Sequence, residues 1–240
     1  MPERAAIVTG ASRGIGLAIA EQLGELGYAL TLAARKPDTL AQTAERLAGR
    51  GYDVAHVAGN MNDEATIQQV VALHRERFGR LDVLVNSAGL GMGAPAGEDQ
   101  TKYIDLQLDV NVRAIILFYR ESLDLLKTAG AEHHGALVVN LASIGGKYPQ
   151  PPLSVYSATK AAVIAYTEAM NKGLSELGIK SVALCPGFVD TDMSEWVKGA
   201  VPAEKMIRTE DIARAVRFLL ELSPSCLVPE IVFQRPGEIG

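Results

Sequence analysis

Thr9-Gly10-Ala11-Ser12-Arg13-Gly14-Ile15-Gly16 joins an apolar run to a helical pattern near the start of the chain. The run 5–9 is predicted to be a strand, and apolar residues then recur at the spacing of one helix face. Glycines at such a junction let the backbone turn sharply, and they let a pyrophosphate approach the helix N-terminus, where free N–H groups favour an anion. The spacing is G-x3-G-x-G rather than G-x-G-x-x-G, so an ordinary glycine-rich turn stays open as an alternative for this segment taken alone.

The same alternation of apolar runs and helical patterns continues to the end of the chain. Further strands are predicted at 28–33, 52–58, 81–85, 136–141, 179–185 and 231–233. Helical patterns lie between them, the longest at 101–128 and 154–177, with Pro37 in a first helical turn and Asn62 and Thr209 as candidate N-caps. This order predicts an α/β fold: one doubly wound, Rossmann-type domain over residues 1–240, with a mainly parallel sheet covered on both faces.

Composition excludes several classes of protein. The chain has 240 residues, 48% of them hydrophobic, and a net charge of −5, which argues against a nucleic-acid surface. Two cysteines are too few for a disulfide framework, and His133-His134 lacks companions for a metal site, so no metal is expected. The start of the chain resembles no secretory signal and no apolar stretch approaches about 20 residues, so we expect no membrane span and a cytoplasmic location.

A candidate catalytic group lies in Tyr156-Ser-Ala-Thr-Lys160, with Ser143 thirteen residues before the tyrosine. A phenol and an ammonium four residues apart share one helix face. The lysine can lower the pKa of the tyrosine from about 10, which makes the phenol a usable acid near neutrality. Ser143 could then bind the substrate oxygen as charge develops on it. The alternative is an ordinary tyrosine at a packing interface.

The end of the second predicted strand indicates which nucleotide binds. An acidic residue there would hold the ribose hydroxyls of NAD. This chain has Ala33-Ala34-Arg35-Lys36 instead. Arg35 offers a planar fork for a 2′-phosphate, and Arg13 in the glycine turn could reach the same group. We therefore expect NADP(H) in preference to NAD(H), with two solvated arginines as the alternative.

Taken together, these motifs resemble those of the short-chain dehydrogenase/reductase family. The resemblance covers nearly the whole chain and adds Asn86-Ser87-Ala88-Gly89, Asn111, and Pro186-Gly187-Phe188-Val189-Asp190-Thr191 to the glycine turn and the Tyr156–Lys160 pair. It implies seven parallel strands in the order 3-2-1-4-5-6-7. It implies an oxidoreductase that transfers hydride between NADP(H) and a ketone or secondary alcohol, with members that reduce 3-oxoacyl thioesters on a carrier protein as a specific alternative. A cofactor-sensing protein without turnover is the alternative of another class.

The resemblance also assigns roles to single residues. Asn86 would stabilise the central strand near the cofactor ribose, and Thr191 would reach the nicotinamide carboxamide. Asn111 would hold a water that links Lys160 to solvent, although from its own context it could equally be a structural residue that breaks a helix. The full set expected at the cofactor is Gly10, Ser12, Arg13, Gly14, Ile15, Gly16, Arg35, Asn60, Met61, Asn86, Ala88, Gly89, Tyr156, Lys160, Pro186, Gly187, Val189 and Thr191.

Two features depart from the family pattern. Asn60 stands where an aspartate usually contacts adenine, so the side chain can hydrogen-bond but carries no charge. The segment 228–237 lacks the small-residue ending common in the family, which puts the usual packing of the tail across a subunit interface in doubt.

Three loops should form the walls of the substrate site, at 90–97, 144–153 and 188–208. The third reads as a mobile lid with an apolar inner surface. The substrate candidates are Met92, Ser143, Tyr148, Tyr156, Phe188 and Trp196. By resemblance, we expect a homotetramer or dimer formed through the helices 101–128 and 154–177, with Ile115, Phe118, Ala162, Val163 and Tyr166 on their apolar faces.

Overall fold

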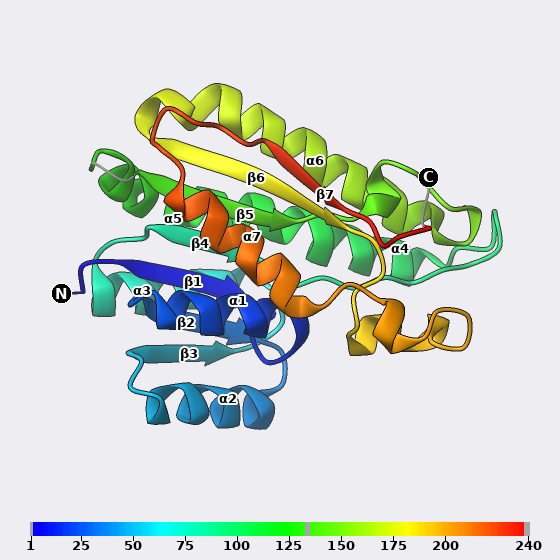
Figure 1. The fold of residues 1–240 in the computed structure, drawn as a ribbon, viewed down its shortest axis with the longest axis horizontal. Helices are drawn as coiled ribbons and strands as arrows, with labels where there is room; N and C mark the ends of the chain where they lie inside the picture. Colours follow the sequence, from blue (N-terminus) through cyan, green and yellow to red (C-terminus); the bar gives the residue numbers. More distant parts are fainter. Residues whose placement is uncertain (1, 133–134, 238–240) are drawn as a thin grey trace.

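The computed structural model describes residues 2–132 and 135–237, and its centre is one seven-stranded sheet (Figure 1). The strands lie in the order β3-β2-β1-β4-β5-β6-β7, and each pairs with its neighbours in parallel. Their bounds are Ala5–Thr9 (β1), Ala29–Ala34 (β2), Val54–Ala58 (β3), Val83–Asn86 (β4), Ala136–Leu141 (β5), Ile179–Pro186 (β6) and Glu230–Phe233 (β7). The fold and the strand order predicted from the sequence are confirmed.

Helices cover both faces of this sheet, as Figure 1 shows. One face carries α1 (Gly14–Glu25), α2 (Pro37–Gly49) and α7 (Thr209–Glu221), and the other carries α3 (Glu64–Phe78), α5 (Ala114–Gly130) and α6 (Ser154–Leu174). Alternation along a strand fills both layers, because Ala6 and Val8 of β1 pack under α1 while Ile7 between them packs on the other side. Strands buried on both faces read as continuous apolar runs, which is why they are easily found in the sequence.

The long helix predicted at 101–128 is interrupted. It consists of α4 (Thr101–Leu108), a π-helical turn over Asp109–Arg113 and α5. Side-chain bonds made by Asn111 accompany the π turn and are described with the site below. A hydrophobic pattern does not register such a turn, because the helix faces continue almost unchanged on either side of it.

Two predicted N-caps are each wrong by one residue. The cap of α3 is Asp63 rather than Asn62, and its carboxylate accepts a hydrogen bond from the Ala65 amide at 3.2 Å. Thr209 is the first residue of α7, and Arg208 occupies the cap position, where its amide donates to the carboxylate of Asp211 at 3.2 Å. In both cases a nearby carboxylate satisfies a free amide at the helix start better than the residue that the local pattern favoured.

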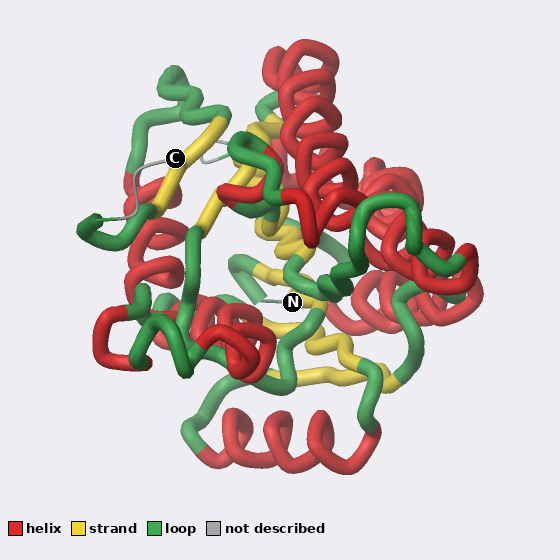
Figure 2. Tube along the Cα trace, turned by 90° about the vertical axis from the view of Figure 1, so that its right-hand side faces the viewer, coloured by secondary structure: helices red, strands yellow, loops and turns green. Residues whose placement is uncertain are grey.

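The loops that follow the carboxyl ends of the strands gather on one side of the molecule, which Figure 2 views face on. They include the short 3-10 helices Ile144–Gly146 and Pro151–Leu153 after β5, and Asp192–Val197 and Ala203–Lys205 after β6. Within the described ranges, no helix is long and apolar enough to cross a membrane. The pair His133-His134 lies outside the described residues.

Candidate active site

The glycine turn between β1 and α1 has the geometry of an anion cradle. Gly10 and Gly14 have φ angles of 66° and 58°, a region that residues with a side chain rarely adopt. A Cβ added at Gly16 would lie 2.5 Å from the carbonyl oxygen of Gly10, so α1 can start this close to the turn only without a side chain there. The α1 cap residue, Arg13, makes no side-chain capping bond, which leaves the first amides of the helix facing outward for a ligand.

Hydrogen bonds tie this turn to the strands on both sides. The Thr9 hydroxyl accepts from the amides of Ser87 and Ala88, each at 3.0 Å, and so joins the ends of β1 and β4. The Ala11 amide donates to the Ala33 carbonyl at 3.3 Å and joins the turn to the end of β2. The cradle is therefore fixed at the centre of the sheet, where the strand order reverses and ligands of such folds bind.

Tyr156 and Ser143 meet at the same edge of the sheet. Tyr156 lies in the first turn of α6, and Ser143 follows β5 as the cap of a short 3-10 helix, where its hydroxyl accepts from the Gly145 amide at 3.1 Å. Burial raises the pKa of Tyr156 above its ordinary value, and a hydrogen bond with Ser143 acts in the opposite direction. The structure thus brings together the phenol and the hydroxyl that the sequence singled out.

Lys160 is buried one helical turn further on. Its ammonium donates to the Leu141 carbonyl at 2.6 Å and lies 5.7 Å from the centre of the Tyr156 ring. Burial lowers the pKa of this lysine to about 8. The expectation that the lysine lowers the tyrosine pKa is not met in this ligand-free geometry, because the ammonium points to a backbone carbonyl and burial dominates the pKa of the phenol.

Asn111 fastens the loop after β4 to α6. Its side-chain oxygen accepts from the Leu90 amide at 3.0 Å, and its amide group donates to the Leu90 carbonyl at 2.8 Å and to the Thr159 hydroxyl at 3.0 Å. A Cβ at Gly89 would lie 3.3 Å from this side-chain oxygen and 3.5 Å from the Lys160 nitrogen. Asn111 therefore lies beside the catalytic lysine, and the bonds it makes here are structural.

The residues expected at the adenosine end of the cofactor lie at the ends of β2 and β3. Arg35 is exposed directly after β2. Asn60 is exposed and Met61 is buried, both after β3. Arg13 is also exposed, and its guanidinium forms an ion pair with Asp192. Two cations therefore flank the site where a 2′-phosphate is expected, but one of them already has an acidic partner.

The remaining cofactor candidates follow β6. Pro186 ends the strand, and the Gly187 amide donates to the Phe233 carbonyl at 2.8 Å, which fixes the exit against β7. Val189 forms an isolated bridge with Ile207. Thr191 packs on the glycine turn, because a Cβ at Gly14 would lie 3.3 Å from its methyl carbon.

The substrate candidates surround Tyr156 from three loops, as predicted for the walls. Gly91 is packed on the tyrosine, since a Cβ there would lie 3.2 Å from a ring carbon. The Met92 amide donates to the buried side chain of Gln107 at 3.1 Å. Tyr148 and Trp196 are 44% and 67% exposed, so both offer aromatic surface at the mouth of the site.

Trp196 also pairs with Phe188 inside the lid. The two rings meet edge to face with their centres 6.0 Å apart. The apolar character expected for this lid is therefore present in its structure, although Trp196 keeps two thirds of its surface exposed.

Several residues that shape the site were not singled out from the sequence. Thr9, Gln107 and Thr159 hold its loops through side-chain hydrogen bonds to the backbone or to Asn111. Of these, only Thr9 carried a local signal, since a hydroxyl directly before the first glycine of the turn can reach the next strand. Among the described residues, no group of three or more His, Cys, Asp or Glu side chains could hold a metal ion.

Comparison with known proteins identifies the family. The family model described as short chain dehydrogenase matches residues 4–200. The chain is 35% identical over 239 residues to a putative ketoacyl reductase 1 of the granaticin polyketide synthase from Streptomyces violaceoruber, covering 90% of this chain and 85% of that protein. The chain therefore belongs to the short-chain dehydrogenase/reductase family of oxidoreductases.

Solved structures agree with this assignment. An alcohol dehydrogenase from the archaeon Thermococcus sibiricus, complexed with 5-hydroxy-NADP, matches with a TM-score of 0.86 and 32% identity over 97% of this chain and 98% of its own. A 3-ketoacyl-(acyl-carrier-protein) reductase from Brucella melitensis, complexed with NADH, matches with a TM-score of 0.84 and 28% identity over 96% of each chain. Both relatives hold nicotinamide cofactors, and the glycine cradle described above fits the pyrophosphate of such a group.

Proposed function

We propose that this protein transfers hydride between NADP(H) and a ketone or secondary alcohol, with Tyr156 as the proton-transferring group. The observation that carries the proposal is the gathering of Tyr156, Ser143 and Lys160 at the carboxyl edge of the sheet, beside the glycine cradle. A binding protein without turnover would not need a phenol, a hydroxyl and a buried ammonium at this one place. The complete set therefore favours an enzyme over a cofactor sensor.

Each of these side chains has a distinct task in the proposed reaction. The bound nicotinamide supplies or accepts the hydride. Tyr156 gives a proton to the carbonyl oxygen in reduction and takes it back in oxidation. Ser143 donates a hydrogen bond to that oxygen as charge develops on it, and it already hydrogen-bonds Tyr156. Lys160, on the same helix face, orients the ribose and stabilises the ionised phenol once the cofactor draws its ammonium from the Leu141 carbonyl.

Replacement of the phenol tests this mechanism. Tyr156→Phe should lower kcat by about 10²- to 10⁴-fold, the contribution typical of a positioned acid or base. The variant should keep its fold and its affinity for NADPH, because only one hydroxyl is removed. Tyr148→Phe is a matched control, since this exposed tyrosine makes the same chemical change at the mouth of the site. An unchanged kcat in Tyr156→Phe would remove the tyrosine from the mechanism.

The preference for NADP(H) is supported by the charges at the end of β2. Arg35 is exposed and takes part in no ion pair among the residues described, so its fork is available to a 2′-phosphate. Arg35→Ala should lower kcat/KM for NADPH by about tenfold or more, which corresponds to one charge-assisted hydrogen-bonding contact of 1.5–3 kcal/mol, and should leave kcat/KM for NADH nearly unchanged. Equal use of both cofactors by the unmutated protein would defeat the assignment.

Reduction of a 3-oxoacyl thioester is a second candidate, favoured by the similarity to a putative ketoacyl reductase. Its carrier protein would need a basic docking surface, and Lys172 is the sequence candidate for it. In the structure, Lys172 pairs with Glu168 one turn earlier at 2.6 Å, so its charge is locally compensated. A panel of ketones, acyl thioesters and secondary alcohols, followed by NADPH absorbance, separates the two candidates, because only a carrier-dependent reductase should prefer thioesters.

We further propose a homo-oligomer, tetramer or dimer, in a reducing cytoplasmic setting. The faces expected to associate need correction at the level of residues, because Ile115, Phe118 and Val163 are buried in the core of the chain itself. Leu108 and Ile116 on the same helices are instead 46% and 40% exposed, and they offer the apolar surface that an interface would cover. The free thiols of Cys185 and Cys226 fit the reducing setting. Light scattering of the purified protein gives the oligomeric state.

A further inference from the structure

We propose that Asp192 sets the preference of this enzyme between phosphorylated and unphosphorylated cofactors. It does so by holding Arg13 in an ion pair that a 2′-phosphate must displace. Displacement would also free the first turn of the lid, residues 188–208, so that cofactor identity and lid position become linked. This inference rests on the proposed function, because it assumes that a nicotinamide dinucleotide occupies the glycine cradle.

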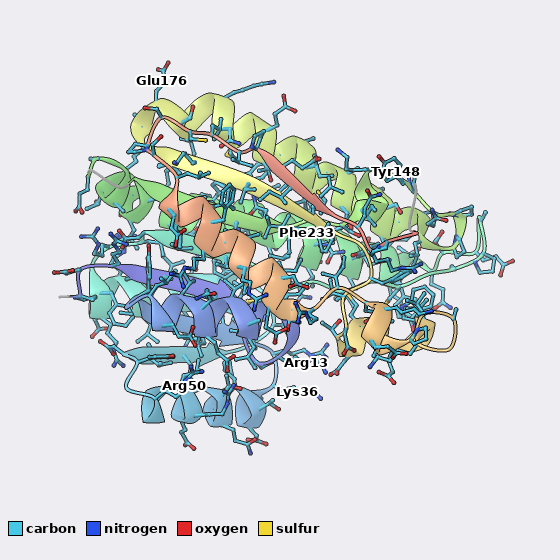
Figure 3. The ribbon with its side chains drawn as sticks, in the orientation of Figure 1. Arg13, Lys36, Arg50, Tyr148, Glu176 and Phe233 are labelled. Atoms are coloured by element: carbon cyan, nitrogen blue, oxygen red, sulfur yellow. The ribbon has the colours of Figure 1, made fainter. Side chains whose placement is uncertain are left out.

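The ion pair joins two segments far apart in sequence. Arg13 caps α1 in the glycine turn, and Asp192 begins the 3-10 helix Asp192–Val197 in the lid. The two side chains are 61% and 69% exposed, so the pair is accessible to a competing anion. Figure 3 labels Arg13 at the carboxyl edge of the sheet, next to the base of the lid.

Other charges of the lid are compensated within the lid itself. Lys198 pairs with Asp190 at 3.2 Å and with Glu195 at 2.8 Å. Backbone bonds close the base of the lid, because the Ile207 amide donates to the Phe188 carbonyl at 3.0 Å. Asp192 instead reaches out of the lid to the cofactor-binding turn. Its pairing is therefore not needed to shape the lid and is free to respond to a ligand.

Arg13 and Arg35 face the same edge of the sheet. The bond from the Ala11 amide to the Ala33 carbonyl fixes the two segments side by side, and each arginine follows two residues after its end of that bond. A phosphate monoester carries about −1.5 to −2 charges at neutral pH, more than the single charge of a carboxylate. NADPH can therefore compete for Arg13, whereas NADH has no group that could replace Asp192 there.

The test measures cofactor binding rather than turnover. We would determine the Kd of NADPH and of NADH by fluorescence titration for the full-length protein and for Asp192→Asn. The variant should bind NADPH about two- to fivefold more tightly, the range that an exposed ion pair can contribute, and should bind NADH as before. Asp190→Asn is the matched control, since it removes the same charge from the same lid without touching Arg13.

A second background separates competition for Arg13 from simple repulsion between Asp192 and the phosphate. In Arg13→Gln, the further change Asp192→Asn should no longer affect the Kd of NADPH. A gain that persists in this background, or an equal gain for NADH, overturns the proposal. If NADPH binds and Arg35→Ala weakens it but Asp192→Asn has no effect, only this inference fails. If neither nucleotide binds, the proposed function fails with it.

Discussion

Two buried cationic or potentially cationic side chains, Lys160 and His74, lie at opposite edges of the sheet. Burial lowers the pKa of both, to about 8 for Lys160 and about 4 for His74. Both nitrogens of His74 have partners, the Thr31 hydroxyl and the Arg80 carbonyl, each at 2.8 Å. Lys160 has three protons and, within the described ranges, one hydrogen bond to Leu141.

The contrast shows that a shifted pKa does not by itself identify a functional group. His74 has used all its hydrogen-bonding capacity in packing between β2 and β4, where its ring also meets Phe78 edge to face at 5.3 Å. Lys160 has capacity left over and lies beside Tyr156 and Gly89, at the edge where the glycine cradle opens. Unused capacity next to a binding site distinguishes the functional group from the structural one.

Removal of each side chain should separate the two roles most widely. Lys160→Met should lower kcat by at least about 10²-fold, as loss of a catalytic electrostatic group does, and should leave the protein at least as stable, because a buried charge disappears. His74→Gln should have nearly the wild-type kcat but lose about 1–3 kcal/mol of stability, the cost of unpaired buried polar groups. Thermal unfolding and kcat measured on both variants would show this crossover, and a stability loss in Lys160→Met without loss of kcat would reverse the assignment.

The pH dependence of stability sharpens the structural side of the comparison. His74 has an ordinary pKa of 6.5 and a folded-state pKa of about 4, so between these values the unfolded chain binds a proton that the folded chain does not. The free energy of unfolding should therefore fall by up to about 3 kcal/mol as the pH drops from 6.5 to 4. The full contribution should be present above pH 6.5.

Urea unfolding at a series of pH values measures this slope. His74→Gln is the control, because it cannot titrate in this range and its curve should be flatter by the same amount. An identical slope for the two proteins would show that His74 is not the group that responds.

Much of the fold and of the site was open to prediction from sequence. The strands β1 and β5 were predicted to the residue, because strands buried on both faces leave unbroken apolar runs bounded by turns. The pair Tyr156 and Lys160 was found because its spacing on one helix carries its meaning locally. The cradle was found because positive φ angles at Gly10 and Gly14 require glycine.

What could not be predicted depends on contacts between distant segments. The partner of Arg13 is a lid residue 179 positions away, and nothing near either residue announces it. The bonds of Asn111 to Leu90 and the π turn around it depend on where the loop after β4 comes to rest. The orientation of the Lys160 ammonium toward a backbone carbonyl likewise follows from the packing of α6 on β5.

The central claim is that the Tyr156 hydroxyl serves the reacting oxygen beside the nicotinamide ring. A crystal structure with NADP⁺ and the best alcohol from the substrate panel tests it most directly. We expect the phenol oxygen within hydrogen-bond reach of the substrate oxygen, about 2.6–3.2 Å, and the substrate carbon facing the nicotinamide. A phenol turned away from the ring, with another group of the chain in contact with that oxygen, would contradict the account.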